Sequence, residues 1–424
     1  MKKYALTLIA ATLLFVACRK EADYMPYVGE SPKLAYSTYT EQFEYLWKTI
    51  STAYVFWDID TVDWDATYTR LLPGFHSLDQ KYKDSGFVRV TDLEPLYTSM
   101  FGSMIDHHMS VYVENLHPHA SDPIPSRINV RPSSIEVPTR PYYIEDRSTE
   151  QAGIQAFLST VEANYTVLAH ESGTFAFDDA GLSSAVTLHY CLFRLPDGRV
   201  VPYLWQSMAA LTPLMKGNGT PAGKALVENW LQAVCNSTNL AGIILDNRAN
   251  RGGFQDDLDY LVGPFLNDRV AIFETRYKEG PGRLEYSAWC PYYQSPNTDY
   301  HRDIAAEGIP YVILTSVNTV SMGEIEPLTA KAVIPTTHVM GERTWGGTCP
   351  LQPNAVDLSY NAPYGDGDNL KGHYIYSSTF GTRIGGQRLE GIGCVPDEVI
   401  NRKDDPSQSF KPLLDAALTY IQNH

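Results

Sequence analysis

Two apolar runs in the second half of the chain each end in a polar turn, and a helical pattern follows each turn. Residues 241–245 and 309–314 are largely apolar, as in buried strands of a parallel sheet. The first run leads to the paired glycines Gly252 and Gly253, and the second leads to Ser321 at a predicted helix start. Backbone amides and a hydroxyl held at rigid strand ends are the parts that acyl-transfer chemistry requires.

The remaining pattern predicts helices in the first quarter of the chain and alternating strands and helices in the second half. Apolar residues recur at helical spacing after Tyr39, and Thr91-Asp-Leu-Glu94 forms a capping box at a helix start. A hairpin is expected to turn at Leu195-Pro-Asp-Gly-Arg199. The sequence therefore predicts an α/β protein with a helical N-terminal domain. Its expected divisions are a helical domain over 36–110, an intervening region over 111–180 and a catalytic core over 181–424.

The N-terminus has the pattern of an export signal. Lys2 and Lys3 precede an apolar stretch from Tyr4 to Val16, which is too short to span a bilayer. The stretch ends in Leu14-Phe-Val-Ala-Cys18, which resembles a lipoprotein signal. Residues 1–17 are thus predicted to be the signal peptide, Cys18 the lipidated first residue and 18–35 a tether. Ordinary secretion is the alternative, since Phe15 is unusual in such a box.

The composition of the chain excludes some classes of binding partner. The net charge of −16 over 424 residues argues against nucleic acid and against adhesion of the protein surface to anionic lipid. The cysteines after Cys18 are widely spaced with no CxxC pair, so no zinc site is indicated. They are expected to be mostly small buried hydrophobic residues, although one disulfide is possible outside the cytoplasm.

Ser321 is the predicted nucleophile, and two amide donors are predicted to stabilise negative charge beside it. A serine at a helix N-terminus lies where backbone N–H groups favour a developing anion. The alternative is that Ser321-Met-Gly-Glu324 is only a capping box, with Glu324 capping its own helix. The amide of Gly252 or Gly253 and that of Met322 are the expected oxyanion-hole donors.

Four segments in order resemble one family, the tail-specific (C-terminal processing) and tricorn core serine peptidases. They are Asp246-Asn-Arg-Ala-Asn-Arg-Gly-Gly253, Val317-Asn-Thr-Val-Ser-Met-Gly-Glu324, Gly341-Glu-Arg-Thr-Trp-Gly-Gly347 and Glu390-Gly-Ile-Gly-Cys-Val-Pro-Asp397. The resemblance implies a ClpP/crotonase-like α/β core with a helical N-terminal domain. It also implies a serine-type peptidase that needs no metal and no organic cofactor.

The resemblance further implies which base serves the serine. One branch of the family uses a lysine where this chain has Gly347, so the Ser-Lys dyad is absent. The other branch uses a histidine from a D-x-H motif and a glutamate near the C-terminal P-D. His108 and Glu390 match these positions, which makes His108 the base and Glu390 the residue that orients it. His107 and Glu342 stay open as alternatives.

The predicted function is a serine endopeptidase of the bacterial cell envelope, lipid-anchored at Cys18, that cleaves peptides or proteins. Many relatives carry a PDZ domain, but no carboxylate-binding loop is recognisable over 111–240. The alternative is an inactive peptide- or glycan-binding lipoprotein on the same scaffold. This alternative is suggested by Met322, Gly323, Gly347 and His107, at which the sequence departs from the family pattern. A crotonase-type acyl enzyme is a weaker third option.

Overall fold

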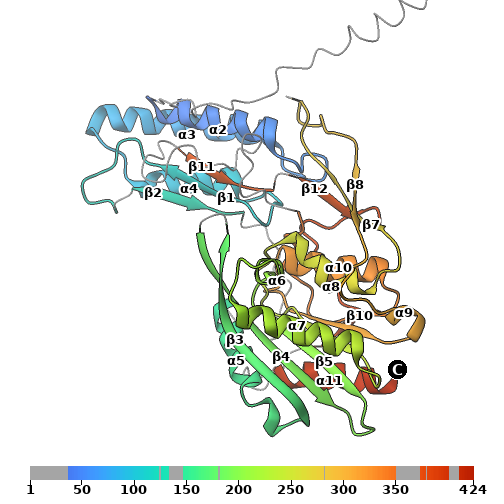
Figure 1. The fold of residues 1–424 in the computed structure, drawn as a ribbon. Helices are drawn as coiled ribbons and strands as arrows, with labels where there is room; N and C mark the ends of the chain where they lie inside the picture. Colours follow the sequence, from blue (N-terminus) through green and yellow to red (C-terminus); the bar gives the residue numbers. More distant parts are fainter. Residues whose placement is uncertain are drawn as a thin grey trace, which may run out of the picture.

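The computed structural model describes residues 37–123, 126–132, 147–179, 182–280, 282–349, 373–378, 380–400 and 410–424. A helical part with a small sheet lies at one end of the molecule, and a larger α/β part lies at the other (Figure 1). The predicted signal peptide, Cys18 and the tether lie outside the described residues. Among the described helices, none is long and apolar enough to cross a membrane.

The N-terminal part joins helices to a sheet that a distant segment completes. Its helices are α2 (Tyr39–Ala53), α3 (Trp64–Ser85) and α4 (Val90–Phe101). Thr38 caps α2 with a capping box, because Glu41 N–H donates to its hydroxyl. The antiparallel sheet has the order β11-β1-β2, with β1 (Ser110–Glu114), β2 (Arg127–Val130) and β11 (His373–Tyr376).

The α/β part is built on a seven-stranded sheet in the order β14-β10-β9-β6-β5-β4-β3. Strands β5, β6, β9, β10 and β14 pair in parallel, while β3, β4 and β5 form an antiparallel meander. The strands are β3 (Val167–Asp179), β4 (Leu182–Arg194), β5 (Val200–Gln206), β6 (Ile243–Asp246), β9 (Tyr311–Thr315), β10 (Thr337–Gly341) and β14 (Glu398–Val399). The predicted hairpin is present as β4 and β5, and its turn closes with a Leu195 N–H to Arg199 carbonyl hydrogen bond.

Helices cover both faces of this sheet, so its central strands are buried on both sides. Side chains at alternate positions of β6 and β9 enter two different hydrophobic clusters: Ile243 and Leu245 face one, and Ile244 faces the other. Residues of α7 (Pro221–Asn236) and α10 (Met322–Val333) belong to the first cluster. Residues of α5 (Arg147–Leu158) and α11 (Phe410–Asn423) belong to the second. The predicted α/β core is therefore present.

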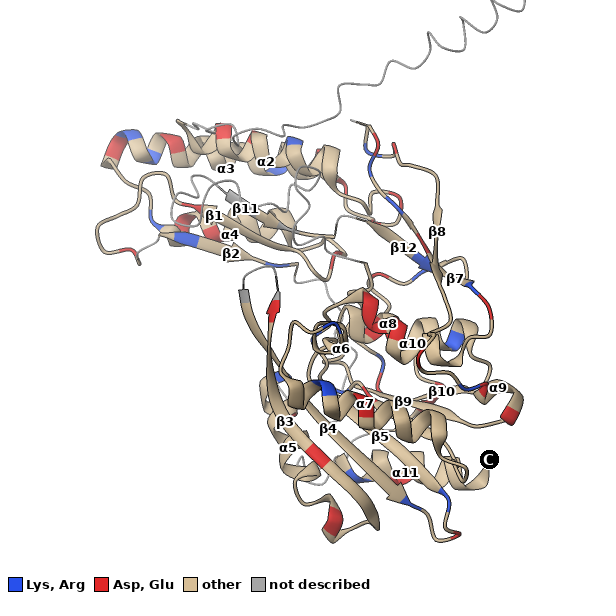
Figure 2. Cartoon of the chain, in the orientation of Figure 1, with Lys and Arg blue, Asp and Glu red and all other residues tan. Residues whose placement is uncertain are grey.

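A second antiparallel sheet, in the order β13-β12-β7-β8, lies beside α10 and reaches the helical part (Figure 1). Its strands are β7 (Val270–Arg276), β8 (Cys290–Gln294), β12 (Gly381–Ile384) and β13 (Gln387–Arg388). Acidic and basic residues are interspersed here and on α3 (Figure 2). Arg276 and Arg388 both pair with Asp58 of the helical part, which ties the two parts together.

Short helices complete the described structure. They are α6 (Leu211–Met215), α8 (Leu258–Leu261), α9 (Ile304–Glu307), η1 (Val161–Ala163), η2 (Gln255–Asp257) and η3 (Gly263–Phe265). All five cysteines of the described segments have free thiols, so no disulfide joins them.

The boundaries of the structural units differ from the expected ones. The first strands of the region over 111–180, β1 and β2, pack their apolar side chains into the cluster of the helical part. The later elements of that region, α5 and β3, belong to the α/β part. The reason is that hydrogen-bond pairing and apolar burial join segments far apart in sequence, which local patterns do not reveal.

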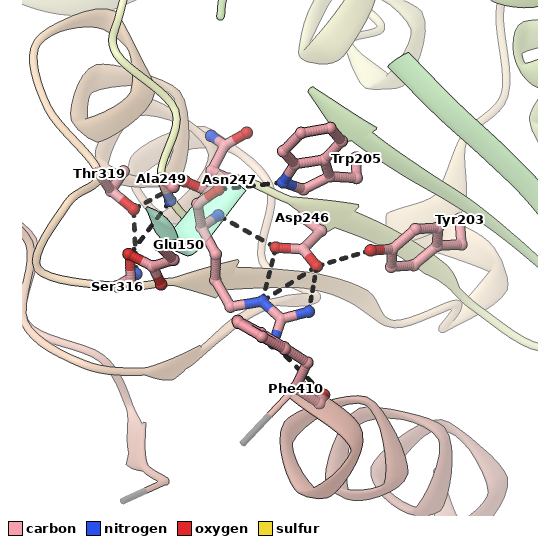
Figure 3. Close-up of polar contacts among 10 residues, drawn as sticks. Glu150, Tyr203, Trp205, Asp246, Asn247, Ala249, Ser316, Thr319 and Phe410 are labelled. Carbon is pink, nitrogen blue, oxygen red and sulfur yellow. Dashed lines mark hydrogen bonds and ion pairs between the residues drawn. The ribbon is translucent and has the colours of Figure 1, made fainter. Parts of the chain in front are cut away.

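The loop after β6 is held by a fully buried ion pair. Arg248 donates to both Asp246 oxygens, and the Tyr203 hydroxyl donates to Asp246 Oδ2 at 2.6 Å (Figure 3). The Arg248 guanidinium also contacts the Phe410 ring and carbonyl of α11. The D-x-R part of the first sequence segment is therefore structural: it fixes the loop that carries the paired glycines.

Replacing Arg248 with Met should destabilise the protein by about 3–5 kcal/mol, because it leaves the Asp246 carboxylate buried without its cation. The measurement is urea unfolding followed by circular dichroism. The double variant Asp246→Leu/Arg248→Met removes both charges and should recover most of the lost stability. Equal losses in the single and double variants would contradict this account of the pair.

Candidate active site

Ser321 lies on a tight turn between β9 and α10, in a backbone conformation that non-glycine residues rarely adopt. Its φ is 60° and its ψ is −124°. The Glu324 N–H donates to the Ser321 carbonyl at 2.8 Å, and the Ser321 N–H donates to Glu324 Oε1 at 3.1 Å. The capping box that the sequence offered as the alternative interpretation of Ser321 is therefore present.

The paired glycines lie directly against this turn. A Cβ on Gly252 would fall 2.5 Å from Ser321 Cβ and 3.0 Å from the Met322 nitrogen, so only glycine permits this approach. The Gly252 N–H is already used, because it donates to Asn250 Oδ1 at 2.8 Å. Within the described structure, the N–H groups of Gly253 and Met322 have no acceptor. Of the three predicted oxyanion-hole residues, Gly253 and Met322 therefore keep an available donor.

Glu324 joins the nucleophile turn to the segment over 344–347. Its Oε1 accepts from Ser321 N–H at 3.1 Å and Gly347 N–H at 2.8 Å. Its Oε2 accepts from Gly346 N–H and the Thr344 hydroxyl. Burial raises the pKa of the Glu324 carboxyl to about 7, despite these donors. Glu324 thus also joins two segments, whereas the sequence had suggested only that it caps its own helix.

The two histidines pack against the glycines of the same segment. A Cβ on Gly346 would lie 2.9 Å from His107 Nδ1, and one on Gly347 would lie 3.1 Å from His108 Cε1. A side chain at position 347, such as the lysine of the dyad branch, would therefore require the His108 ring to shift by a few tenths of an ångström. His107 Nδ1 donates to the Trp345 carbonyl at 2.7 Å, because a carbonyl can only accept. That bond occupies His107, whereas His108 has both ring nitrogens available.

Glu390 lies close to His108, whereas the alternative Glu342 accepts from the Val317 N–H beyond the strand end. One ring nitrogen of His108 and one oxygen each of Glu390 and Asp106 lie within 4.8 Å of one another. Glu390 Oε1 accepts from His107 N–H at 3.1 Å, and Oε2 accepts from Cys349 N–H at 2.9 Å. Burial and the nearby Asp106 carboxylate raise the pKa of Glu390 well above its usual range.

The structure places the predicted residues around one turn but does not complete their hydrogen bonds. Neither ring nitrogen of His108 has a partner within the described structure, so the bonds to Ser321 and Glu390 are not made. Catalytic hydrogen bonds are often long or absent before substrate binds. The roles of Ser321, His108 and Glu390 stay predictions.

Sequence reasoning gave no role to two residues near this site. Asp106 accepts from His108 N–H at 2.9 Å, which fixes the backbone that carries the histidine. Arg147, at the start of α5, donates to the Asn318 carbonyl and lies close enough to lower the pKa of His108. The D-x-H spacing could have pointed to Asp106, but no local pattern connects Arg147 to a residue 171 positions away.

Comparisons with known proteins find a matching family model and similar folds. Residues 219–400 match the family model described as peptidase family S41. A candidate peptidase from Parabacteroides merdae has a similar structure, with a TM-score of 0.58 and 20% identity over 91% of this chain and 97% of that one. The mature protein CPAF has a TM-score of 0.51 and 12% identity over 91% of this chain and 98% of its own. These likenesses show the shared fold. No curated protein matches the sequence.

The His108 ring should titrate near pH 4, because burial, and then the charge of Arg147, lower its pKa from 6.5 to about 4. The measurement is an NMR titration of histidine Cε1–H signals, with His108→Gln to assign the resonance. The unfolded chain binds this proton more readily, so unfolding free energy should rise with pH between about 4 and 6.5. A midpoint near 6.5 would contradict the buried environment described here.

Proposed function

Since residues 219–400 belong to peptidase family S41, we propose that this serine-type peptidase cleaves peptide bonds through an acyl-enzyme formed on Ser321. The observation that carries the proposal is the Ser321 turn itself. A strained turn holds the Ser321 hydroxyl beside the available amides of Gly253 and Met322, and His108 packs against the adjoining Gly347.

In the proposed reaction, Ser321 Oγ attacks the carbonyl carbon of the scissile peptide while His108 accepts the hydroxyl proton. The carbonyl oxygen becomes an oxyanion and accepts hydrogen bonds from Gly253 N–H and Met322 N–H. His108 then gives its proton to the leaving amine, and water releases the acyl group by the reverse sequence. With a pKa of about 4 the His108 ring is neutral near pH 7, and a nearby carboxylate is needed to raise its basicity when it accepts the proton.

Glu390 is proposed to orient His108 during these steps. Backbone donors from His107 and Cys349 hold its carboxylate in place, and an oxygen of Glu390 lies within 4.8 Å of a His108 nitrogen. A small rotation of the imidazole therefore brings it within reach of that oxygen. A carboxylate beside the ring then stabilises the imidazolium that forms when Ser321 loses its proton.

The proposed setting is the bacterial cell envelope, with the protein lipid-anchored at Cys18. The support is the sequence from Lys2 to Cys18, with its charged start, apolar stretch and lipoprotein-like box. The net charge of −16 fits attachment through a lipid rather than through the protein surface. The proposed substrates are peptides or unfolded proteins of that compartment.

Ser321→Ala should lower kcat/KM for peptide hydrolysis by roughly 10⁴-fold or more, because the nucleophile is lost while the fold is kept. Ser159→Ala, at an exposed serine after α5, is the matched control and should retain activity. The measurement is cleavage of a fluorogenic peptide library, with a fluorophosphonate probe to label the active serine. Equal hydrolysis or labelling by the Ser321→Ala variant would overturn the assignment.

Cys18→Ala should abolish incorporation of a fatty-acid analogue and move the protein from the membrane fraction to the soluble fraction. The reason is that the cysteine thiol is the only proposed attachment point for lipid. The measurement is metabolic labelling of cells with an alkyne fatty acid, followed by fractionation. Unchanged membrane attachment in the variant would contradict the proposed anchor without affecting the proposed chemistry.

A further inference from the structure

Asp106, His108 and Glu390 form a compact cluster beside the Ser321 turn. One ligand atom from each lies within 4.8 Å of the other two. Both carboxyl groups are buried, and both ring nitrogens of His108 are buried without a hydrogen-bond partner in the described segments. His108 as a whole is only half-buried, so the cluster lies near solvent. The ring nitrogens of His108 thus have no hydrogen-bond partner in the described segments, and two carboxyl groups lie close to one of them.

No lysine or arginine of the described segments forms an ion pair with Asp106 or Glu390, and the nearest cation that acts on the cluster is Arg147, which lies close enough to lower the pKa of His108. The neighbouring donors are neutral groups: backbone N–H groups and the hydroxyls of Ser377, Ser378 and Thr348. Buried carboxylates are ordinarily paired with a cation or bind a metal ion. Within the described residues this cluster has no paired cation, and its three ligand atoms lie within 4.8 Å of one another, so that small side-chain movements would bring them to a common ion.

Backbone N–H groups and a serine hydroxyl donate hydrogen bonds to the two carboxyl groups and so fix their orientation, as hydrogen-bond partners do for metal-binding carboxylates. Glu390 Oε2 accepts from Thr348 N–H and Cys349 N–H, while Oε1 accepts only from His107 N–H and keeps a lone pair. Asp106 accepts from Ser378 N–H at 2.9 Å and from the Ser378 hydroxyl at 3.2 Å. That hydroxyl can rotate and free a lone pair of Asp106.

We propose that Asp106, His108 and Glu390 bind a divalent transition-metal ion of the Zn²⁺ class, and that the bound ion inhibits the enzyme. An imidazole nitrogen with two carboxylate oxygens is a ligand set that Zn²⁺ accepts, with a fourth position left for water. The ion takes the lone pair with which His108 would accept the Ser321 proton. The inhibition rests on the proposed function, whereas the binding of the ion does not.

The binding test uses Zn²⁺ alone with the full-length Ser321→Ala protein after treatment with EDTA. Isothermal titration calorimetry should show one tight site, which His108→Gln or Asp106→Asn weakens by about tenfold or more. His338→Asn is the matched control, because His338 also lies near two carboxylates, those of Asp397 and Glu398, but outside the cluster. Cys290→Ser controls for zinc capture by the exposed thiol. Neither control should change the tight site.

A spectroscopic readout keeps the test decisive if a variant fails to fold. Co²⁺ bound to the otherwise unaltered Ser321→Ala protein should give the visible absorption of a four-coordinate site with nitrogen and oxygen ligands, and Zn²⁺ should remove it. Absence of this band, together with no tight Zn²⁺ site, overturns the proposal. A tight site that persists in His108→Gln, or that disappears in Cys290→Ser, also overturns it.

The activity test separates this proposal from the proposed function. With wild-type protein, stoichiometric Zn²⁺ should suppress peptide hydrolysis at least about tenfold, and EDTA should restore it. Tight binding at the cluster without loss of activity refutes the inhibition. A protein that binds Zn²⁺ there but never hydrolyses a peptide, even with EDTA, refutes the proposed function and supports the site.

Discussion

The Glu324 carboxylate accepts hydrogen bonds from the nucleophile turn and from the segment over 344–347 at the same time. This arrangement holds Ser321 at a positive φ and places Gly347 against His108. The strained conformation of the turn is maintained because the hydrogen bonds to Glu324 hold both the turn and the segment over 344–347 in place. Without this carboxylate, four donors from two segments would be left buried and unpaired. The position of the serine relative to the histidine therefore depends on one side chain that takes no part in the proposed reaction.

Glycines provide the space for this assembly. Gly252 lets the loop after β6 touch Ser321, and Gly346 and Gly347 make room for the two histidines. At Gly347 any side chain would press against the His108 ring, because its Cβ would lie 3.1 Å from His108 Cε1. The glycine that stands where the dyad branch has its lysine therefore also makes room for the histidine.

The sequence predicted the elements with strong local signals and failed where distant segments meet. Apolar runs at 241–245 and 309–314 correctly marked β6 and β9, because strands buried on both faces have continuous apolar sequences. The helical start of the chain and the β4–β5 hairpin were likewise predicted. The pairing of β1 with β11 was not, since nothing local in residues 110–114 specifies a partner over 373–376. For the same reason the role of Glu324 and the proximity of Asp106 to Glu390 became visible only in three dimensions.

The pairing of β1 with β11 also sets the order in which the chain can assemble. His108 lies two residues before β1, and the partner strand of β1 is made more than 250 residues later. A growing chain can pair β1 with β2 early, but it cannot complete the sheet that follows its histidine segment until nearly all of the sequence has been made. The third strand of the sheet beside His108 is therefore added only at the end of synthesis, after the segment that carries Ser321.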